Sequence, residues 1–304
     1  MNFRQTLFLE GIKKLLGGGI ITAGSIKGFF AGIIAVFQLT GAILFDTPVT
    51  PYGPKIDLTD RELVWSDEFN GTEIDKKIWS NNSDGIRRGG YWDMDSQVSV
   101  KDGHLYITTE YREDGDYGPG WYTAEVETMN TVEPEYGYLE CRCICAPGYG
   151  IWSAFWTFSH GVGKIDGTGH DGAEIDIFES PNYYKNALRR NAITHNVHYD
   201  GYAEAHKTAY TGHWNAKNPY TEFNTYGVEW TPDELIFYIN GVESSRISGD
   251  CVPNVKEWLK LSVEIDGENG VPTQPNGNSI LDNEEGQSFK SDFIVDYVRV
   301  YKAK

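Results

Sequence analysis

The residues with the clearest potential for chemistry lie in the short segment Asp171–Ser180, which reads DGAEIDIFES. Glu174, Asp176 and Glu179 are interleaved there with large apolar side chains, which indicates a strand with one buried face. Regular alternation places Glu174 and Asp176 on the same face but turns Glu179 to the other. One extra residue in a β-bulge returns Glu179 to the face of the first two acids. We therefore predict a bulged strand that carries three carboxylates on one face.

Three carboxylates on one face repel one another, so the pKa of at least one of them must rise. With the bulge, Glu174 and Glu179 are about four strand positions apart, roughly 13 Å between Cα atoms. On a concave sheet their carboxyl groups can lean together to about 5–5.5 Å, the separation found in retaining glycosidases. Asp176, between them, can hydrogen-bond one of the two. A solvated acidic strand face and a divalent-metal cluster remain the alternatives on these residues alone.

The chain after Leu63 is predicted to consist of short β-strands. Runs rich in Tyr, Val, Ile, Thr and Trp are separated by turns rich in Gly, Asn and Asp. These runs occupy residues 104–109, 122–128, 137–146, 223–230 and 235–239. Asn240 and Gly241 predict a hairpin, because a type I′ turn requires positive φ at two successive residues. The pattern favours a sandwich, jelly roll or barrel, with a long loop over 266–290.

Composition excludes several classes of protein. The 304 residues carry a formal net charge of −18, so a nucleic-acid backbone or an anionic membrane would be repelled. A hydrophobic content of 40% with 14% aromatic residues is typical of a folded domain rather than a disordered chain. Four cysteines are too few for a disulfide framework in a protein of this size.

Residues 1–60 differ from the rest, and we divide the chain into this segment and a domain at 61–304. Gly28–Phe45 contains 18 residues without a formal charge, a helical length of roughly 27 Å. Basic residues precede it and acidic residues follow it, which predicts a membrane anchor with the domain outside the cytoplasm. A cleaved signal and an interfacial or packed helix are the alternatives. Prolines in 48–60 predict an extended linker.

Four ordered segments resemble glycoside hydrolase family 16. They are LVWSDEFNG at 63–71, YGYLECRCICAPGYGIWSAFW at 136–156, EIDIFE at 174–179 and DYVRVY at 296–301. The spacing E-x-D-x-x-E is similar to that of the laminarinase-like branch. The resemblance implies a β-jelly-roll sandwich of two antiparallel sheets with a concave substrate cleft. It also implies a retaining endo-β-glycosidase with Glu174 as nucleophile, Glu179 as general acid/base and Asp176 as the assisting carboxylate.

The same resemblance suggests residues that bind the sugar. Glu140 and Arg142 correspond to a pair that faces the cleft, although a surface ion pair is the alternative. Trp152 and Trp156 resemble cleft tryptophans, whose indole faces stack on pyranose rings, although either can belong to the core. Two further residues complete the expected binding set, Trp92 in a Gly-rich loop and His198, which can bond Asp176 or the substrate or be a core histidine.

A structural calcium ion is implied by the resemblance alone, with Glu68, the Gly103 carbonyl and Asp296 as ligands. Oxygen ligands suit this hard cation, although Asp296 can instead accept backbone hydrogen bonds. The resemblance implies no cofactor for catalysis. Cys141, Cys143 and Cys145 alternate along one predicted strand, about 6.6 Å apart, which suits small buried groups better than a zinc site.

The expected partner is a polysaccharide or oligosaccharide, and we expect a monomer that binds no nucleic acid and contacts a membrane only through its N-terminal segment. A β-1,3- or β-1,3-1,4-glucan is the first expectation for the substrate. Departures from the laminarinase pattern at 91–103, 122–128 and 259–270 make a galactan or a galactose-containing glycan the alternative. A non-catalytic carbohydrate-binding jelly roll and an anchored adhesion protein are the other classes considered.

Overall fold

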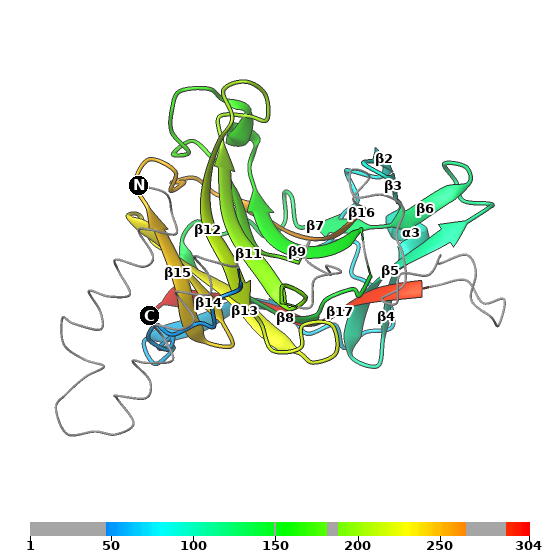
Figure 1. The fold of residues 1–304 in the computed structure, drawn as a ribbon, viewed down its shortest axis with the longest axis horizontal. Helices are drawn as coiled ribbons and strands as arrows, with labels where there is room; N and C mark the ends of the chain where they lie inside the picture. Colours follow the sequence, from blue (N-terminus) through cyan, green and yellow to red (C-terminus); the bar gives the residue numbers. More distant parts are fainter. Residues whose placement is uncertain (1–46, 149, 181–187, 266–289) are drawn as a thin grey trace.

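The structure is a computed structural model that describes residues 47–148, 150–180, 188–265 and 290–304. Its strands form two sheets, which pack face to face around the core (Figure 1). The larger sheet has the order β15 (Val242–Ser248), β14 (Glu234–Ile239), β13 (Asn224–Trp230), β8 (Gly137–Ile144), β17 (Lys290–Ala303), β5 (His104–Arg112), β6 (Gly120–Thr123), β3 (Gly90–Trp92) and β2 (Gly85–Arg87), with β1 (Arg61–Asp67) on β17 and β4 (Val98–Lys101) on β5. The smaller sheet has the order β12 (Lys207–Asn215), β11 (Ala192–Tyr199), β10 (Glu174–Glu179), β9 (Ile151–Phe158), β16 (Trp258–Ile265) and β7 (Glu125–Glu127).

Pairing within both sheets is antiparallel, apart from the parallel contact of β3 with β6. The described residues include one short helix, α3 (Met94–Gln97), and a 3₁₀ turn, η1 (His160–Gly163). The strands of the smaller sheet bend together, so the face turned away from the core is concave (Figure 1). The prediction of an all-β sandwich is confirmed.

Alternation along β16 shows how the sequence separates the two faces of the smaller sheet. Leu259, Leu261 and Val263 point into the core and are buried there. Lys260 and Ser262 therefore point to the concave face, because successive side chains of a strand lie on opposite sides. The same rule places the acids of β10 on the concave face.

The predicted hairpin at Asn240 and Gly241 is confirmed. The two residues have φ angles of 51° and 72°, as a type I′ turn requires, and they join β14 to β15. The run predicted at 122–128 is instead divided at Ala124, where the chain leaves β6 in the larger sheet and enters β7 in the smaller one. Alternation alone could not show this change of sheet, because both short strands are buried almost throughout.

Part of the predicted linker packs against the domain. Val49 is buried in the core, and its N–H donates to the carbonyl of His213 in β12. A few residues later the chain bridges to Val242 of β15, through Lys55. Residues 49–55 therefore cover the edges of both sheets, and the folded unit begins before residue 61. The predicted apolar helix lies outside the described residues, and none of the helices that the structure describes is long and apolar enough to cross a membrane.

All four cysteines are buried and none forms a disulfide. Cys141 and Cys143 point from β8 into the core between the sheets, among apolar side chains. This placement agrees with the role of small buried groups expected from their spacing.

Candidate active site

The strand β10 contains the predicted bulge. Against β11, Asp176 pairs with Asn196 and Glu179 pairs with Thr194, so two residues of β10 oppose one residue of β11. Against β9, the register shifts in the same interval, between Asp176 and Phe178. The bulge restores the side-chain alternation that the sequence breaks, and its prediction is confirmed.

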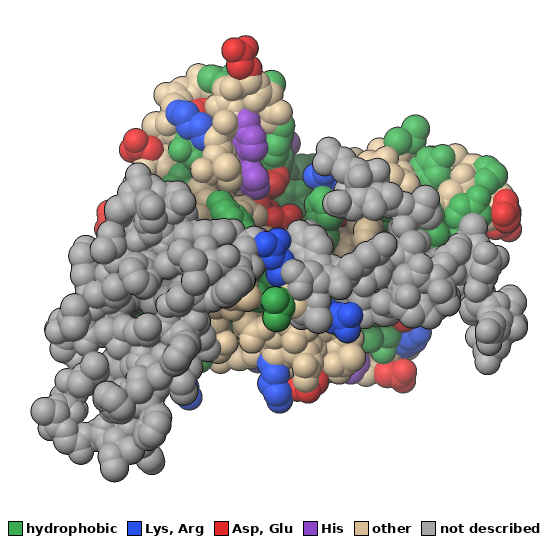
Figure 2. Space-filling model, in the orientation of Figure 1, with side chains coloured by type: hydrophobic (Ala, Val, Ile, Leu, Met, Phe, Trp, Pro, Cys, Tyr) green, Lys and Arg blue, Asp and Glu red, His purple; other side chains and the backbone are tan. Residues whose placement is uncertain are grey.

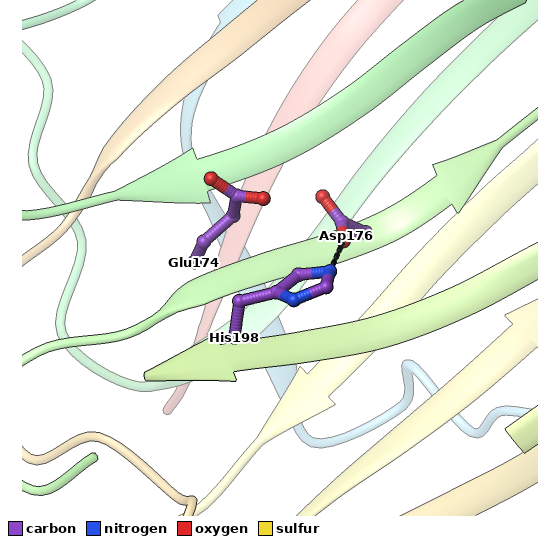
Figure 3. A group of neighbouring side chains, drawn as sticks. All are labelled: Glu174, Asp176 and His198. Atoms are coloured by element: carbon purple, nitrogen blue, oxygen red, sulfur yellow. Dashed lines mark ion pairs between the residues drawn. The ribbon is translucent and has the colours of Figure 1, made fainter. Parts of the chain in front are cut away.

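The three acids of β10 consequently occupy the concave face, while the apolar residues between them are fully buried. Figure 3 shows Glu174 and Asp176 pointing from β10 toward the same space, with His198 reaching it from β11. His198 Nε2 lies 3.3 Å from Asp176 Oδ2, the contact expected from the sequence. Its part in sugar binding stays a prediction.

The surroundings of the three carboxylates favour the protonated form of two of them. Loss of hydration, followed by the charges of Asp176 and Glu174, raises the pKa of Glu179 well above its ordinary value. Loss of hydration and the charge of Glu174 likewise raise the pKa of Asp176 well above its usual range. The group can therefore offer an acid that holds its proton more strongly than an ordinary glutamic acid, beside a second carboxylate.

Two hydrogen bonds orient the outer acids, and their donors were not identified from the sequence. Asn196 Nδ2 donates to Glu179 Oε2 at 2.6 Å. Tyr202, in the loop after β11, donates its hydroxyl proton to Glu174 Oε2. Asn196 could have been found, because it lies two residues before His198 and shares its strand face. Tyr202 gives no such signal, since its position depends on the path of a loop.

The same side chains also allow a metal interpretation, which is the weaker one. Ligand atoms of Glu174, Asp176 and His198 all lie within 4.8 Å of one another. The ligand atoms already have protein partners, however, because Glu174 Oε2 accepts the Tyr202 hydroxyl proton and His198 Nε2 faces Asp176 Oδ2. We therefore interpret this group as acid–base machinery.

Trp152 and Trp156 of β9 share the strand face of Asp176, because Trp156 pairs with Asp176 in the register. Trp156 is only 8% exposed, and its indole N–H donates to Ser262 Oγ at 3.0 Å. Trp152 is half-buried, and the Arg88 guanidinium lies 4.8 Å from its ring centre. Both rings lie on the concave face as expected, and their contact with a sugar stays a prediction.

Trp92 does not belong to this group, and its predicted role is contradicted. It is 3% exposed, and its indole N–H donates to the Val263 carbonyl at 2.9 Å. The Arg87 guanidinium lies over its ring, 4.5 Å from the centre. Trp92 therefore packs β3 against β16 and offers no free face to a sugar.

Glu140 and Arg142 are also placed differently from the prediction. They lie on β8 of the larger sheet, whose alternate residues Cys141 and Cys143 point into the core. The side chains of Glu140 and Arg142 therefore face the outside of the sandwich, opposite the concave face. Glu140 accepts hydrogen bonds from two tyrosines, one of them Tyr297, at 2.8 Å. The prediction that this pair binds sugar is wrong. The alternative of a surface ion pair holds for Arg142 alone, which pairs with Asp296, whereas Glu140 is buried.

Two of the three predicted calcium ligands, Asp296 and Glu68, are already paired with cations. Asp296 forms an ion pair with Arg142 and lies 3.6 Å from His104 Nε2. Glu68 accepts two hydrogen bonds from Arg299, at 2.9 and 2.8 Å. Two guanidinium groups thus supply the positive charge that a calcium ion would bring. These residues do not fit the calcium site that the resemblance implied.

A charged cluster lies beside the acids on the concave face. Lys260 Nζ, only 5% exposed, lies 3.0 Å from Glu125 Oε1 and 2.9 Å from Glu127 Oε2, and 4.6 Å from the Trp156 ring centre. Figure 2 shows a depression between two lobes of the molecule, with acidic and histidine side chains on its wall. The hollow therefore lies beside charged groups and tryptophan rings, the combination of polar and aromatic side chains expected of a ligand site.

Comparisons with known proteins agree with this arrangement. Residues 62–303 match the family model described as Beta-porphyranase A-D, GH16 domain. The chain is 22% identical over 301 residues to glucan endo-1,3-beta-glucosidase A1 of Niallia circulans, covering 83% of this chain but only 42% of that protein. It is 25% identical over 270 residues to beta-porphyranase B of Zobellia galactanivorans, covering 79% of this chain and 88% of that protein.

Among solved structures, the fold is similar to that of SCLam, a non-specific endo-beta-1,3(4)-glucanase from family GH16. The TM-score is 0.65 at 26% identity, covering 85% of this chain and 98% of that one. The predicted jelly-roll fold is thereby confirmed.

Proposed function

Because this chain belongs to glycoside hydrolase family 16, we propose that it cleaves a β-linked polysaccharide internally by the retaining mechanism, with a β-1,3- or β-1,3-1,4-glucan as substrate. Glu174 is the nucleophile, Glu179 the general acid/base and Asp176 the assisting carboxylate. The observation that carries the proposal is the bulge in β10, since it brings the acids to one face.

The proposed reaction has two steps. In the first, the Glu174 carboxylate attacks the anomeric carbon while Glu179 gives its proton to the departing glycosidic oxygen, which leaves a glycosyl ester on Glu174. In the second, Glu179 takes a proton from water as the water oxygen attacks the same carbon and the ester bond breaks. The configuration is retained because two inversions cancel, and Glu179 is protonated again at the end.

The charges and hydrogen bonds around the three acids suit their separate roles in this reaction. An acid that protonates a leaving group must hold its proton until the transition state, and the raised pKa of Glu179 favours this. Tyr202 holds the Glu174 carboxylate from one side by its hydrogen bond. Asp176, which also has a raised pKa, lies between them and can donate its proton in a hydrogen bond to Glu174.

Two named relatives support a glucan as substrate. One is described as a glucan endo-1,3-beta-glucosidase and the other as a non-specific endo-beta-1,3(4)-glucanase. The half-buried Trp152 on the concave face offers an apolar surface for a glucose ring.

A galactan is the second candidate, because the matching family model and the Zobellia galactanivorans relative are both described as beta-porphyranases. The sequence departures also fall near the cleft. Glu264, which replaces the small or amide residue often found in the family, pairs with Arg87 at 2.6 Å and Arg88 at 3.3 Å. This charged group alters the end of the cleft where Trp152 lies, because Glu264 and Trp152 pair in the register.

A reducing-sugar assay over laminarin, lichenan, agarose, carrageenan, porphyran and a poly-lactosamine glycan tests both candidates. We expect new reducing ends on laminarin or lichenan, with a rapid fall in viscosity that marks internal cleavage. Activity on porphyran alone would select the second candidate. Glu174→Gln should abolish the release while the fold is kept, and Glu73→Gln, on the surface of the same domain, is the matched control. A Glu174→Gln variant with full activity contradicts the proposed mechanism.

We further propose that residues 1–45 carry the domain out of the cytoplasm and anchor it to a membrane. The support is the charge-free stretch of 18 residues with basic residues before it and acidic residues after it. Fractionation of cells that express the full chain tests this proposal. We expect the chain in carbonate-washed membranes at its full mass, whereas a shortened chain in the medium would indicate a cleaved signal. The monomeric state stays a prediction.

A further inference from the structure

The fully buried His195 lies behind the catalytic strand and takes no part in the proposed reaction. Its side chain points from β11 into the core, where its ring stacks on Phe237 with centres 4.7 Å apart. Nδ1 lies 2.6 Å from the carbonyl oxygen of Ile177, and Nε2 lies 2.9 Å from Ser244 Oγ of β15. One side chain thus connects the strand of the acids to the opposite sheet.

Ile177 is the extra residue of the bulge. On one side, Ile177 and Phe178 together oppose His195. On the other side, Asp176 and Phe178 pair with successive residues of β9, which leaves Ile177 without a partner in the register. A buried carbonyl at such a position needs a donor from elsewhere. The His195 imidazole is that donor.

The two neighbours determine the tautomer of His195. The Ile177 carbonyl can only accept, so Nδ1 carries the proton and Nε2 is the acceptor for the Ser244 hydroxyl. The Ser244 oxygen also lies 3.0 Å from the Phe237 carbonyl, so its proton is shared between two acceptors. Burial lowers the pKa of His195 to about 3, which keeps the imidazole neutral in this arrangement.

We propose that His195 is a positioning residue for Glu179, because its hydrogen bond to Ile177 holds the bulge that turns Glu179 toward the cleft. This inference rests on the proposed role of Glu179 as general acid/base. Ile177 lies two residues before Glu179, so a bulge that relaxes or migrates redirects the Glu179 carboxyl group. Trp152, on a neighbouring strand, keeps its place, and substrate binding is therefore expected to change less than the chemical step.

Two amide variants separate the two hydrogen bonds of His195. His195→Asn keeps an N–H close to the place of Nδ1 and loses the contact with Ser244. His195→Gln reaches the place of Nε2 and loses the donor to Ile177. Val100→Ala, in the core on β4 of the larger sheet, measures what a general loss of stability does to the rate. We would measure kcat, KM and the melting temperature of each on the best polysaccharide of the wild type.

We expect kcat of His195→Gln to fall by about 10- to 100-fold with KM changed by less than about threefold, because small displacements of a catalytic group have effects of this size. His195→Asn should stay within about threefold of the wild-type kcat. Val100→Ala should melt earlier but keep its kcat well below the melting temperature.

Equal kcat values in the two amide variants overturn the positioning role. A Val100→Ala variant that loses kcat in step with its stability also overturns it. If either amide variant fails to fold, Ser244→Ala is measured in place of that comparison. It removes the contact with Nε2 of His195 but leaves the Nδ1–H donor to Ile177, so it must keep the wild-type kcat. A wild-type chain that cleaves none of the polysaccharides, or a fully active Glu179→Gln variant, overturns the proposed function and this inference with it. If the wild type is active and the two amide variants have equal kcat values, only this inference is overturned.

Discussion

Replacement of Lys260 by methionine should destabilise the domain strongly at pH 8 and much less at pH 5. Lys260 is 5% exposed, and its Nζ lies 3.0 Å from Glu125 Oε1 and 2.9 Å from Glu127 Oε2. Methionine keeps most of the apolar stem but removes the charge that both carboxylates share. Breaking a buried pair in this way typically costs about 3–5 kcal/mol, because an uncompensated charge stays behind.

The dependence on pH follows from Glu125. Burial raises its pKa from 4.5 to about 7, while Lys260 acts against this rise. Below pH 4.5 the carboxyl group is protonated in the folded and the unfolded chain alike. As pH rises from there toward 7, the unfolded chain releases a proton that the folded chain keeps, so stability falls through this window. Without Lys260 the pKa of Glu125 rises further and the fall continues above pH 7. At pH 5 Glu125 is neutral in the folded state, and the missing cation matters less.

Urea unfolding followed by tryptophan fluorescence measures this effect at both pH values. We expect Lys260→Met to lose about 3–5 kcal/mol at pH 8 and less than half of that at pH 5. Adding Glu125→Gln should recover part of the loss at pH 8. Lys76→Met, which breaks an exposed pair with Asp95, is the control and should change little at either pH. An equal loss at the two pH values, or none at pH 8, would refute the reasoning.

Three other predictions concern the cleft and the calcium ligands. Asn196→Ala should move the basic limb of the pH profile of kcat/KM to higher pH. Loss of its hydrogen bond raises the pKa of Glu179, so the acid stays protonated to a higher pH. A basic limb that does not move would speak against Glu179 as the acid. Trp152→Ala should raise KM for the polysaccharide by about 10-fold while the melting temperature stays within a few degrees, since a stacked ring contributes about 1–2 kcal/mol; unchanged KM would remove Trp152 from the binding surface. The melting temperature should be the same in EDTA and in calcium chloride, for the wild type and for Asp296→Asn, and a calcium-dependent rise that Asp296→Asn abolishes would contradict the ion pairing of Asp296.

Periodicity was sufficient for those parts of the fold that depend on neighbouring residues. The hairpin at Asn240 and Gly241 follows from the local requirement for positive φ. The bulge in β10 follows from the broken alternation between Asp176 and Glu179, since only an extra residue restores one face. The change of sheet at Ala124 could not be predicted in this way, because the sheet that a strand joins is decided by distant partners.

The same distinction between neighbouring residues and distant partners applies to the candidate site. The three acids could be predicted because they lie on one strand, whereas Glu140 and Arg142 could not be placed, because alternation gives two faces and does not say which one is the cleft. The error in the calcium ligands has the same origin, since Arg142 extends from the outer face to Asp296. Tyr202 and Lys260 were missed because their partners come from other elements, which a single sequence does not bring together.

The most direct test of the central claim uses azide to rescue the alanine variants of the two glutamates on an activated aryl β-glycoside, with the products identified by proton NMR. In Glu179→Ala, azide should attack the glycosyl ester and give the β-glycosyl azide. In Glu174→Ala, azide should enter the space of the missing carboxylate and give the α-glycosyl azide. The two anomers would establish that Glu174 and Glu179 act on opposite faces of one sugar ring. The same anomer from both variants, or rescue of neither, would contradict the account.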